Sequence, residues 1–187
     1  MSAQQPGGGY VIVVIEFIVR GLDVDRDGYY TQKDWESRKQ RAARFENLLI
    51  AVNPGGTGDI TESHVAWRYR KALPYVPSPL FYEGRIYFIK DGGIASSLDA
   101  STGDAFYAQH RIGKTANYYA SPIAADGRIY FASLSGQVIV IKAGGTVPEI
   151  LHQAEFGTRI LATPAIADDQ LFLRTETQLW AFRSGER

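Results

Sequence analysis

The chain has no cysteine among its 187 residues. It therefore forms no disulfide and offers no thiolate as a nucleophile or a zinc ligand. It also has no excess of charge of one sign, because 20 basic side chains balance 20 acidic ones. Proteins that bind nucleic acid use an excess of basic charge to attract phosphates, so we expect no nucleic-acid partner.

Long apolar runs are missing as well. The longest extends over residues 11–19 and is interrupted by Glu16, whereas a membrane-spanning helix needs about 20 apolar residues. We therefore expect no membrane span. Residues 1–9 carry no charged side chain and Arg20 follows the run, which differs from the pattern of a cleaved secretory signal. The β-branched residues of segment 10–22 leave both helix and strand open.

One acidic segment carries explicit chemistry. Residues 23–34 read DVDRDGYYTQKD and resemble the twelve-residue EF-hand loop, in which carboxylates at positions one, three and five converge on calcium. Gly28 permits the sharp turn at position six. Position twelve is Asp in place of Glu, one methylene shorter, which predicts weak calcium binding. A metal-free turn is the alternative. The expected calcium ligands are Asp23, Asp25, Asp27, Tyr29 through its carbonyl, Thr31 and Asp34.

The segment after this loop has apolar residues at three- and four-residue intervals. They are Trp35, Ala42, Phe45, Leu48, Leu49 and Val52. The spacing predicts an amphipathic helix over 35–52 that leaves the calcium loop, and the Asn-Pro-Gly-Gly sequence at 53–56 would end it. No second EF-hand loop occurs in the sequence, so we expect a structural calcium site and not a switch.

The remainder of the chain repeats itself. Three hydroxyl-Pro pairs begin at residues 78, 121 and 163, which are 43 and 42 positions apart. Each precedes two short strand-like segments. The turns before the first of these segments read Glu83-Gly84, Asp126-Gly127 and Asp168-Asp169, and such hairpins need positive φ, which glycine adopts easily. A period of this length with about four strands is typical of β-propeller blades.

A turn in the first repeat carries a family resemblance. Residues 99–103 read Asp-Ala-Ser-Thr-Gly and resemble the Asp-x-x-Thr-Gly turn of PQQ-type β-propeller repeats, in which the next strand bears Trp. Tyr107 stands in that Trp position, and Lys142 replaces the Asp in the second repeat. Together with the calcium loop, the chain resembles bacterial PQQ-binding-like repeat proteins of the kind common in planctomycetes, over residues 22–183. The resemblance implies a periplasmic or extracellular location, although we see no signal peptide.

The expected fold is mainly β. It is a partial β-propeller of about three four-stranded blades, preceded by an EF-hand-like loop and helix. The expected domains are an N-terminal segment (1–21), the loop and its exiting helix (22–56) and the blades (57–187). Residues 64–183 hold about 2.8 repeat periods, whereas propellers close with about four to eight blades. We therefore expect a C-terminal fragment of a longer protein, or a ring completed by a protein partner or by self-association.

The expected function is a non-catalytic interaction scaffold with structural calcium. The alternatives are a fragment of a PQQ-dependent quinoprotein dehydrogenase and an inert truncated fragment. Such a dehydrogenase needs a closed ring with the quinone at its axis and a catalytic carboxylate, none of which the sequence assigns, so we expect no PQQ and no catalytic residue. The three histidines lack metal-ligand spacing, and no Gly-x-Ser-x-Gly elbow occurs. The loop over 110–119, with Asn117-Tyr118-Tyr119, is either a contact surface or an ordinary connection between blades.

Overall fold

A computed structural model of the chain describes residues 11–15, 32–42 and 47–183. These residues form one helix and fourteen strands. The elements are β1 (Val11–Ile15), α1 (Gln32–Ala42), β2 (Leu48–Val52), β3 (Val65–Tyr69), β4 (Leu80–Tyr82), β5 (Arg85–Lys90), β6 (Ile94–Asp99), β7 (Ala105–Arg111), β8 (Ile123–Ala125), β9 (Arg128–Ala132), β10 (Gln137–Lys142), β11 (Ile150–Glu155), β12 (Ala165–Ala167), β13 (Gln170–Arg174) and β14 (Leu179–Arg183).

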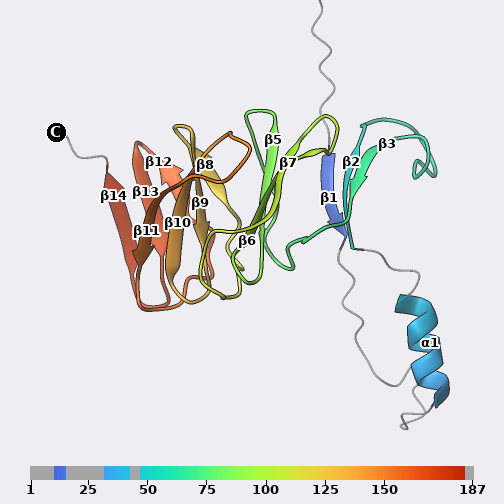
Figure 1. Ribbon diagram of the computed structural model, residues 1–187, viewed down its shortest axis with the longest axis horizontal. Helices are drawn as coiled ribbons and strands as arrows, with labels where there is room; N and C mark the ends of the chain where they lie inside the picture. Colours follow the sequence, from blue (N-terminus) through green and yellow to red (C-terminus); the bar gives the residue numbers. More distant parts are fainter. Residues whose placement is uncertain (1–10, 16–31, 43–46, 184–187) are drawn as a thin grey trace, which may run out of the picture.

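The strands make four antiparallel sheets. In chain order the first sheet is β1-β2-β3, the second β4-β5-β6-β7, the third β8-β9-β10-β11 and the fourth β12-β13-β14. The sheets stand side by side along the long axis of the molecule, and α1 lies beyond the first sheet (Figure 1). The predicted mainly-β fold and its blade-like repeats are confirmed.

The hairpin turns adopt the predicted backbone. Glu83 and Gly84 have φ of 48° and 74°, and Asp126 and Gly127 have φ of 49° and 68°. Two residues with positive φ give the turn whose twist matches that of the flanking strands. In the third repeat Asp168 and Asp169 reach 47° and 60° without glycine, because Asp is among the few other residues that tolerate this region.

The apolar core lies between neighbouring sheets. Leu49, Ala51 and Trp67 of the first sheet pack against Ile86 and Phe88 of the second. The same alternation of side chains repeats down the stack, because successive residues of a strand point to opposite faces. Tyr87 and Ile89 pack against the third sheet, and Ala132 and Val138 of the third sheet pack against Leu173 of the fourth.

The first sheet corrects one sequence-based prediction. The predicted helix over 35–52 was wrong for Leu48–Val52, which is strand β2 and pairs with both β1 and β3. The segment Leu-Leu-Ile-Ala-Val is apolar throughout, and periodicity cannot distinguish a helix from a buried strand in so short a run. Leu49 and Ala51 are completely buried, so packing against the second sheet decides for the strand.

The helix α1 also differs from expectation. Trp35 was expected on the apolar face of the helix, but its side chain is 46% exposed, and the Lys39 ammonium lies 5.8 Å from the Trp35 ring centroid.

The predicted domain boundary at residue 56 lies between the paired strands β2 and β3, and the domain limits stay a prediction. Within the described ranges, no helix combines the length and apolar character needed to span a bilayer.

Candidate interaction surfaces of the sheet stack

The predicted calcium ligands are mostly outside the described residues. This applies to Asp23, Asp25, Asp27, Tyr29 and Thr31. The backbone of Asp34 belongs to α1. Calcium binding by this segment therefore stays a prediction. In the described ranges, no three His, Asp or Glu side chains lie together as a metal site would require.

The Asp99 turn between β6 and β7 is held by its own side chains. The Asp99 carboxylate accepts hydrogen bonds from the Ser101 N–H (2.7 Å), the Ser101 hydroxyl (2.5 Å) and the Thr102 N–H (3.2 Å). The hydroxyl of Thr102 accepts from the Asp104 N–H. The bond from the Ser101 hydroxyl is the main reason that the pKa of Asp99 is lowered. The motif that carries the family resemblance is thus a self-capped turn.

The same turn joins the first sheet to the second. The Trp67 indole N–H donates to the Ala100 carbonyl at 3.0 Å. Gly103 has φ of 77°, and a Cβ on it would lie 2.7 Å from Cδ2 of Trp67. Glycine is therefore required here both by the backbone conformation and by the close approach of the ring. Tyr107, in the family's Trp position, is only 4% exposed.

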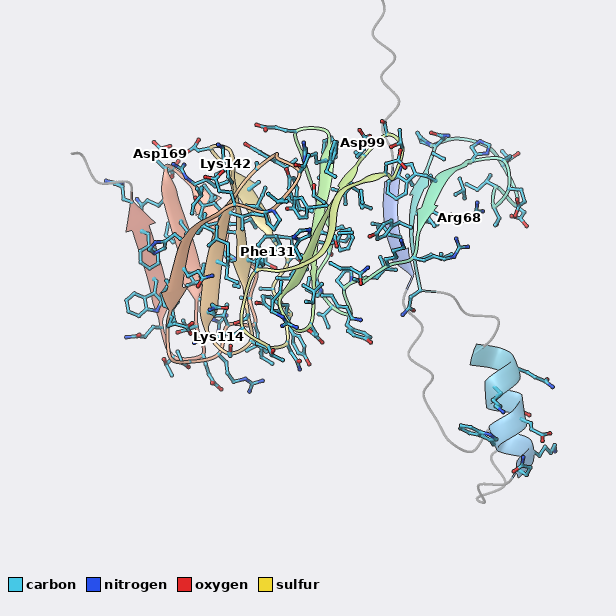
Figure 2. All side chains as sticks on the ribbon, viewed as in Figure 1. Arg68, Asp99, Lys114, Phe131, Lys142 and Asp169 are labelled. Atoms are coloured by element: carbon cyan, nitrogen blue, oxygen red, sulfur yellow. The ribbon has the colours of Figure 1, made fainter. Side chains whose placement is uncertain are left out.

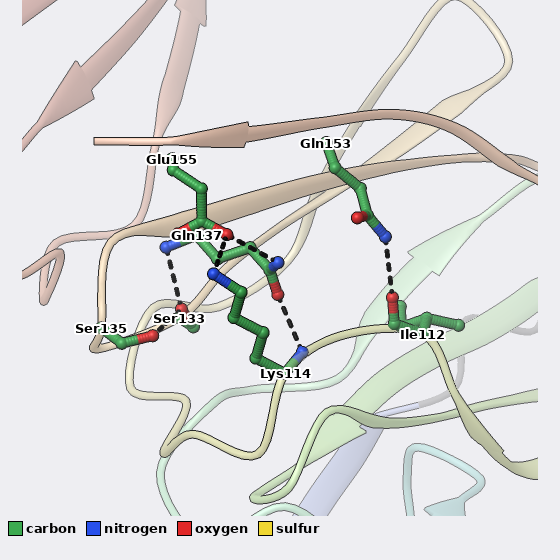
Figure 3. Close-up of polar contacts among 7 residues, drawn as sticks. All are labelled: Ile112, Lys114, Ser133, Ser135, Gln137, Gln153 and Glu155. Carbon is green, nitrogen blue, oxygen red and sulfur yellow. Dashed lines mark hydrogen bonds and ion pairs between the residues drawn. The ribbon is translucent and has the colours of Figure 1, made fainter. Parts of the chain in front are cut away.

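The expected contact loop at 110–119 is a rigid junction between the second and third sheets. The Asp91 carboxylate accepts from the Tyr118 N–H at 2.7 Å, and the Asn117 carbonyl accepts from the Leu134 N–H. Gln137 Oε1 accepts from the Lys114 N–H at 2.9 Å, and Gln153 donates to the Ile112 carbonyl (Figure 3). The sequence reasoning overlooked Gln137 because an isolated glutamine carries no pattern.

Only part of that loop faces solvent. Tyr118 was expected on the surface but is completely buried in the core between the sheets, because strands β5 and β10 leave an apolar space that its ring fills. Burial raises the pKa of Tyr118 to about 12, so the phenol is neutral near pH 7. Tyr119 is 39% exposed, and Lys114 and Asn117 are exposed beside it.

Lys114, Gln137 and Glu155 form a polar cluster on the rim of the stack that carries the loop at 110–119. The Lys114 ammonium lies 2.8 Å from Glu155 Oε1, and the Gln137 amide donates to the same oxygen at 2.9 Å (Figure 3). Lys114 is the main cause of the lowered pKa of Glu155, and Gln137 adds to the effect. The cluster positions the loop over the third sheet. Its groups are already paired with one another, which is the arrangement of a structural contact.

The opposite rim has a second set of inter-sheet contacts. Asp99, Lys142 and Asp169 lie along it, away from Lys114 (Figure 2). Tyr82 and Tyr87 of the second sheet accept hydrogen bonds from the backbone N–H groups of Gly127 and Gly144 in turns of the third.

Arg85 adds two further contacts on that rim. It donates to the Gly145 carbonyl at 2.6 Å, and its guanidinium carbon lies 3.6 Å from the Phe106 ring centroid. Both rims are thus fastened by polar contacts.

Exposed apolar side chains gather at the fourth sheet. Trp180 and Phe182 on β14 stack with an interplanar angle of 7°, and Phe156 meets Trp180 edge-on at 5.5 Å. The large apolar residues exposed between β11 and the end of β14 are Ile150, Leu151, Leu161, Ile166, Leu179, Trp180 and Phe182. Such a concentration marks an interaction surface more often than a random scatter does.

A shallow cavity lies next to this sheet. Its volume is about 400 Å³, and its lining residues are Leu161, Ala162, Arg174, Thr175 and Glu176. The lining offers a guanidinium, a carboxylate and a hydroxyl. It has neither a histidine nor a second carboxylate that could serve as a paired acid and base.

Comparison with known proteins identifies the fold. No protein-family model matches the chain, and no curated protein matches it. Among solved structures, BamB from Moraxella catarrhalis is 19% identical with a TM-score of 0.56 over 72% of this chain and 39% of that one. The computationally designed Ika4 protein is 12% identical with a TM-score of 0.55, over 75% of this chain and 88% of its own.

A quinohemoprotein alcohol dehydrogenase, ADHIIG from Pseudomonas putida HK5, is also similar. It is 11% identical with a TM-score of 0.51, over 69% of this chain and 27% of that one. The chain thus spans less than half the length of BamB and of this dehydrogenase. At these identities the similarity concerns the fold alone. The chain has the fold of PQQ-like β-propeller proteins, in the form of an open stack of four sheets.

Proposed function

We propose that this chain is a non-catalytic interaction scaffold of the propeller type that carries a structural calcium loop at residues 23–34. The observation that supports it most directly is the exposed apolar surface of the fourth sheet, where Leu179 is 70% exposed. The polar side chains on the two rims hold neighbouring sheets together. The surface left for other molecules is therefore the end of the stack, where the apolar Leu179 lies opposite Arg174 in register, and the polar loop at 110–119.

That loop is suited to specific recognition. Tyr119 and Asn117 are exposed on a backbone that hydrogen bonds to both flanking sheets hold in place. Side chains on a rigid loop lose little conformational entropy when a partner binds. Capture of a protein by the chain that fails with Tyr119→Asp, and persists with Val147→Asp, would support this surface. Equal capture by both variants would contradict it.

The calcium loop is tested by isothermal titration. We expect binding in the micromolar range or weaker, because Asp34 replaces the bidentate Glu at position twelve. Asp25→Ala removes a carboxylate of the proposed site and should abolish the heat. Asp59→Ala is the matched control, since Asp59 caps an exposed turn by accepting from the Thr61 N–H. Unchanged titration of Asp25→Ala would refute the site.

A quinoprotein dehydrogenase fragment is the second candidate, because a quinohemoprotein alcohol dehydrogenase shares the fold. A dye-reduction assay with added PQQ, calcium and a primary alcohol separates the two. We expect no turnover above the background without protein. Turnover that depends on both PQQ and the chain would overturn the non-catalytic proposal.

A further inference from the structure

The four sheets of the described residues form a row that is open at both ends (Figure 1), and we call this row the arc. The first and fourth sheets lie at opposite ends of the stack and each packs against one neighbour (Figure 1). The match to BamB indicates how much of a ring the arc represents. It covers 72% of this chain but 39% of BamB, so 0.72 × 187/0.39 gives that chain roughly 350 residues, about eight of the repeats seen here. A ring of that length would need four sheets besides the four described here, which is the number that one more copy supplies.

Every internal junction in the stack joins two kinds of face. We call the face that meets the following sheet the forward face, and the face that meets the preceding sheet the rear face. At the junction of the second and third sheets, the forward face contributes Tyr87 and Ile89. The rear face contributes Ile129, Phe131 and Ile139. The Tyr87 ring at the centre of one face thus packs among aliphatic side chains and the Phe131 ring of the next.

Among the described residues, no sheet covers the forward face of the fourth sheet. Leu173 is 1% exposed and packs against the third sheet, so the adjacent Phe172 points the other way. Phe172 is the third residue of its strand, as Tyr87 is of β5, and it lies between Ala165 and Ala181 in register. Whereas Tyr87 is completely buried, Phe172 is partly exposed.

In the part of the chain that the structure describes, no sheet precedes the first sheet on its rear face. Leu49 and Ala51 are buried against the second sheet, so Leu48, Ile50 and Val52 are on the opposite face. All three are partly exposed. They are aliphatic, as Ile129 and Ile139 are on the rear face of the third sheet. At their centres the two ends of the arc present apolar side chains like those of the internal junctions, whereas Arg68 lies on the rear face of the first sheet and Arg174 on the forward face of the fourth.

We propose that a second copy of this chain joins both ends, so that two chains close a ring of eight sheets with a two-fold axis. In this ring Phe172 of each copy packs on Leu48, Ile50 and Val52 of the other. Head-to-tail contacts that close leave no free end, and closure covers both apolar faces. The inference rests on the proposed scaffold function, because it assigns the ends of the stack to self-association.

The first test is the mass in solution. Light scattering after size-exclusion chromatography should give about 41 kDa, twice the 20.7 kDa of one chain. A mass of one chain, or a ladder of larger masses from open polymers, would overturn the proposal. Neither result bears on calcium binding or on the dye-reduction assay, so failure of the ring and failure of the proposed function can be told apart.

Two charge variants test which faces meet. Phe172→Lys and Ile50→Glu should each reduce dimer formation by roughly tenfold or more, because each leaves a charge buried in both junctions. Ile50 lies opposite Arg68 in register, so the new carboxylate can pair with Arg68 in the separate chain, whereas burial of this ion pair in the junction carries a desolvation cost. Val147→Lys is the control, since Val147 is a 61% exposed apolar residue on a loop away from both faces. It should leave the mass unchanged.

Mixing the two variants distinguishes head-to-tail from face-to-face contact. A mixed ring has one unaltered junction and one Lys–Glu junction, so the mixture should recover dimer that neither variant forms alone. Circular dichroism spectra that match the unmodified chain establish that both variants are folded. Absence of recovery from two folded variants, or dimer formation by either variant at the original strength, would refute the proposed junction.

Discussion

Gly103 shows how one residue fixes the junction of the first two sheets. Two separate constraints require glycine at this position. Its φ is 77°, and an added Cβ would lie only 2.7 Å from the Trp67 ring. Gly84 has a similar φ of 74°, with nothing within 4 Å of its Cβ position. The pair therefore separates backbone strain from steric overlap, which a single substitution would combine.

We expect Gly103→Ala to lower the free energy of unfolding more than Gly84→Ala. Both variants incur about 1–2 kcal/mol from the left-handed backbone conformation. Gly103→Ala adds about 1–3 kcal/mol because the new methyl group displaces the Trp67 ring. Urea unfolding measures both values, and Trp67 fluorescence reports the ring. If both variants lost the same free energy of unfolding, steric overlap with Trp67 would add nothing to the cost of Gly103→Ala.

The turn between β6 and β7 should make stability depend on pH. The Ser101 hydroxyl first, and then the Ser101 N–H, lowers the pKa of Asp99 from its ordinary 3.8. The folded carboxyl therefore stays ionised to lower pH than the unfolded one. Its contribution is fully present above the unfolded pKa and is lost as pH falls through the folded pKa.

Asp99→Asn should therefore lower Tm at pH 7, whereas the difference from the unmodified chain should shrink as the pH falls below about 3.8. The effect should be small, because Asp99 is on the surface and solvent screens its contacts. Thermal melts from pH 7 to pH 2.5 test this. Asp126→Asn is the control, since Asp126 occupies a hairpin turn with φ of 49° that Asn also adopts. A pH-independent difference for Asp99→Asn would contradict the assignment.

Individual elements were predictable where sequence and packing agreed. The sequence predicted strands over 85–88, 128–131 and 170–173 from the repeat and its turn residues, and the structure confirms them as parts of β5, β9 and β13. Leu48–Val52 was not predictable as a strand, because all five residues are apolar and its partner β1 lies over thirty positions earlier in the sequence. The inserted segment between β1 and β2 interrupts the repeat that identifies the other sheets.

The candidate site was predicted less completely than the fold. Tyr118 stands between two residues that face solvent, and only the space between the second and third sheets places its ring inside. The contacts of Gln137 with Lys114 and Glu155 join three segments that share no motif. Such contacts depend on how the sheets stack, which a single sequence does not encode in any local pattern.

At the scale of the whole molecule, the sheets gain stability mainly from their neighbours. In repeat architectures the interfaces between units contribute much of the free energy, and the first and fourth sheets each have one such interface. Their outer strands are therefore expected to open more readily than β5, β6, β9 and β10, which are enclosed on both faces. Closure of the ring would add an interface at each end and so raise the stability of the weakest sheets.

Self-association also couples stability to concentration. A dimer that dissociates on unfolding gains about 1.4 kcal/mol per tenfold rise in protein concentration, or about 0.7 kcal/mol per chain. This corresponds to a rise in Tm of about 1–3 °C for chains of this size. Scanning calorimetry at about 5 and about 50 µM should show this rise for the unmodified chain and for Val147→Lys. Phe172→Lys should melt at one temperature at both concentrations. A concentration-independent Tm for the unmodified chain would mean that the four sheets are held by one chain alone.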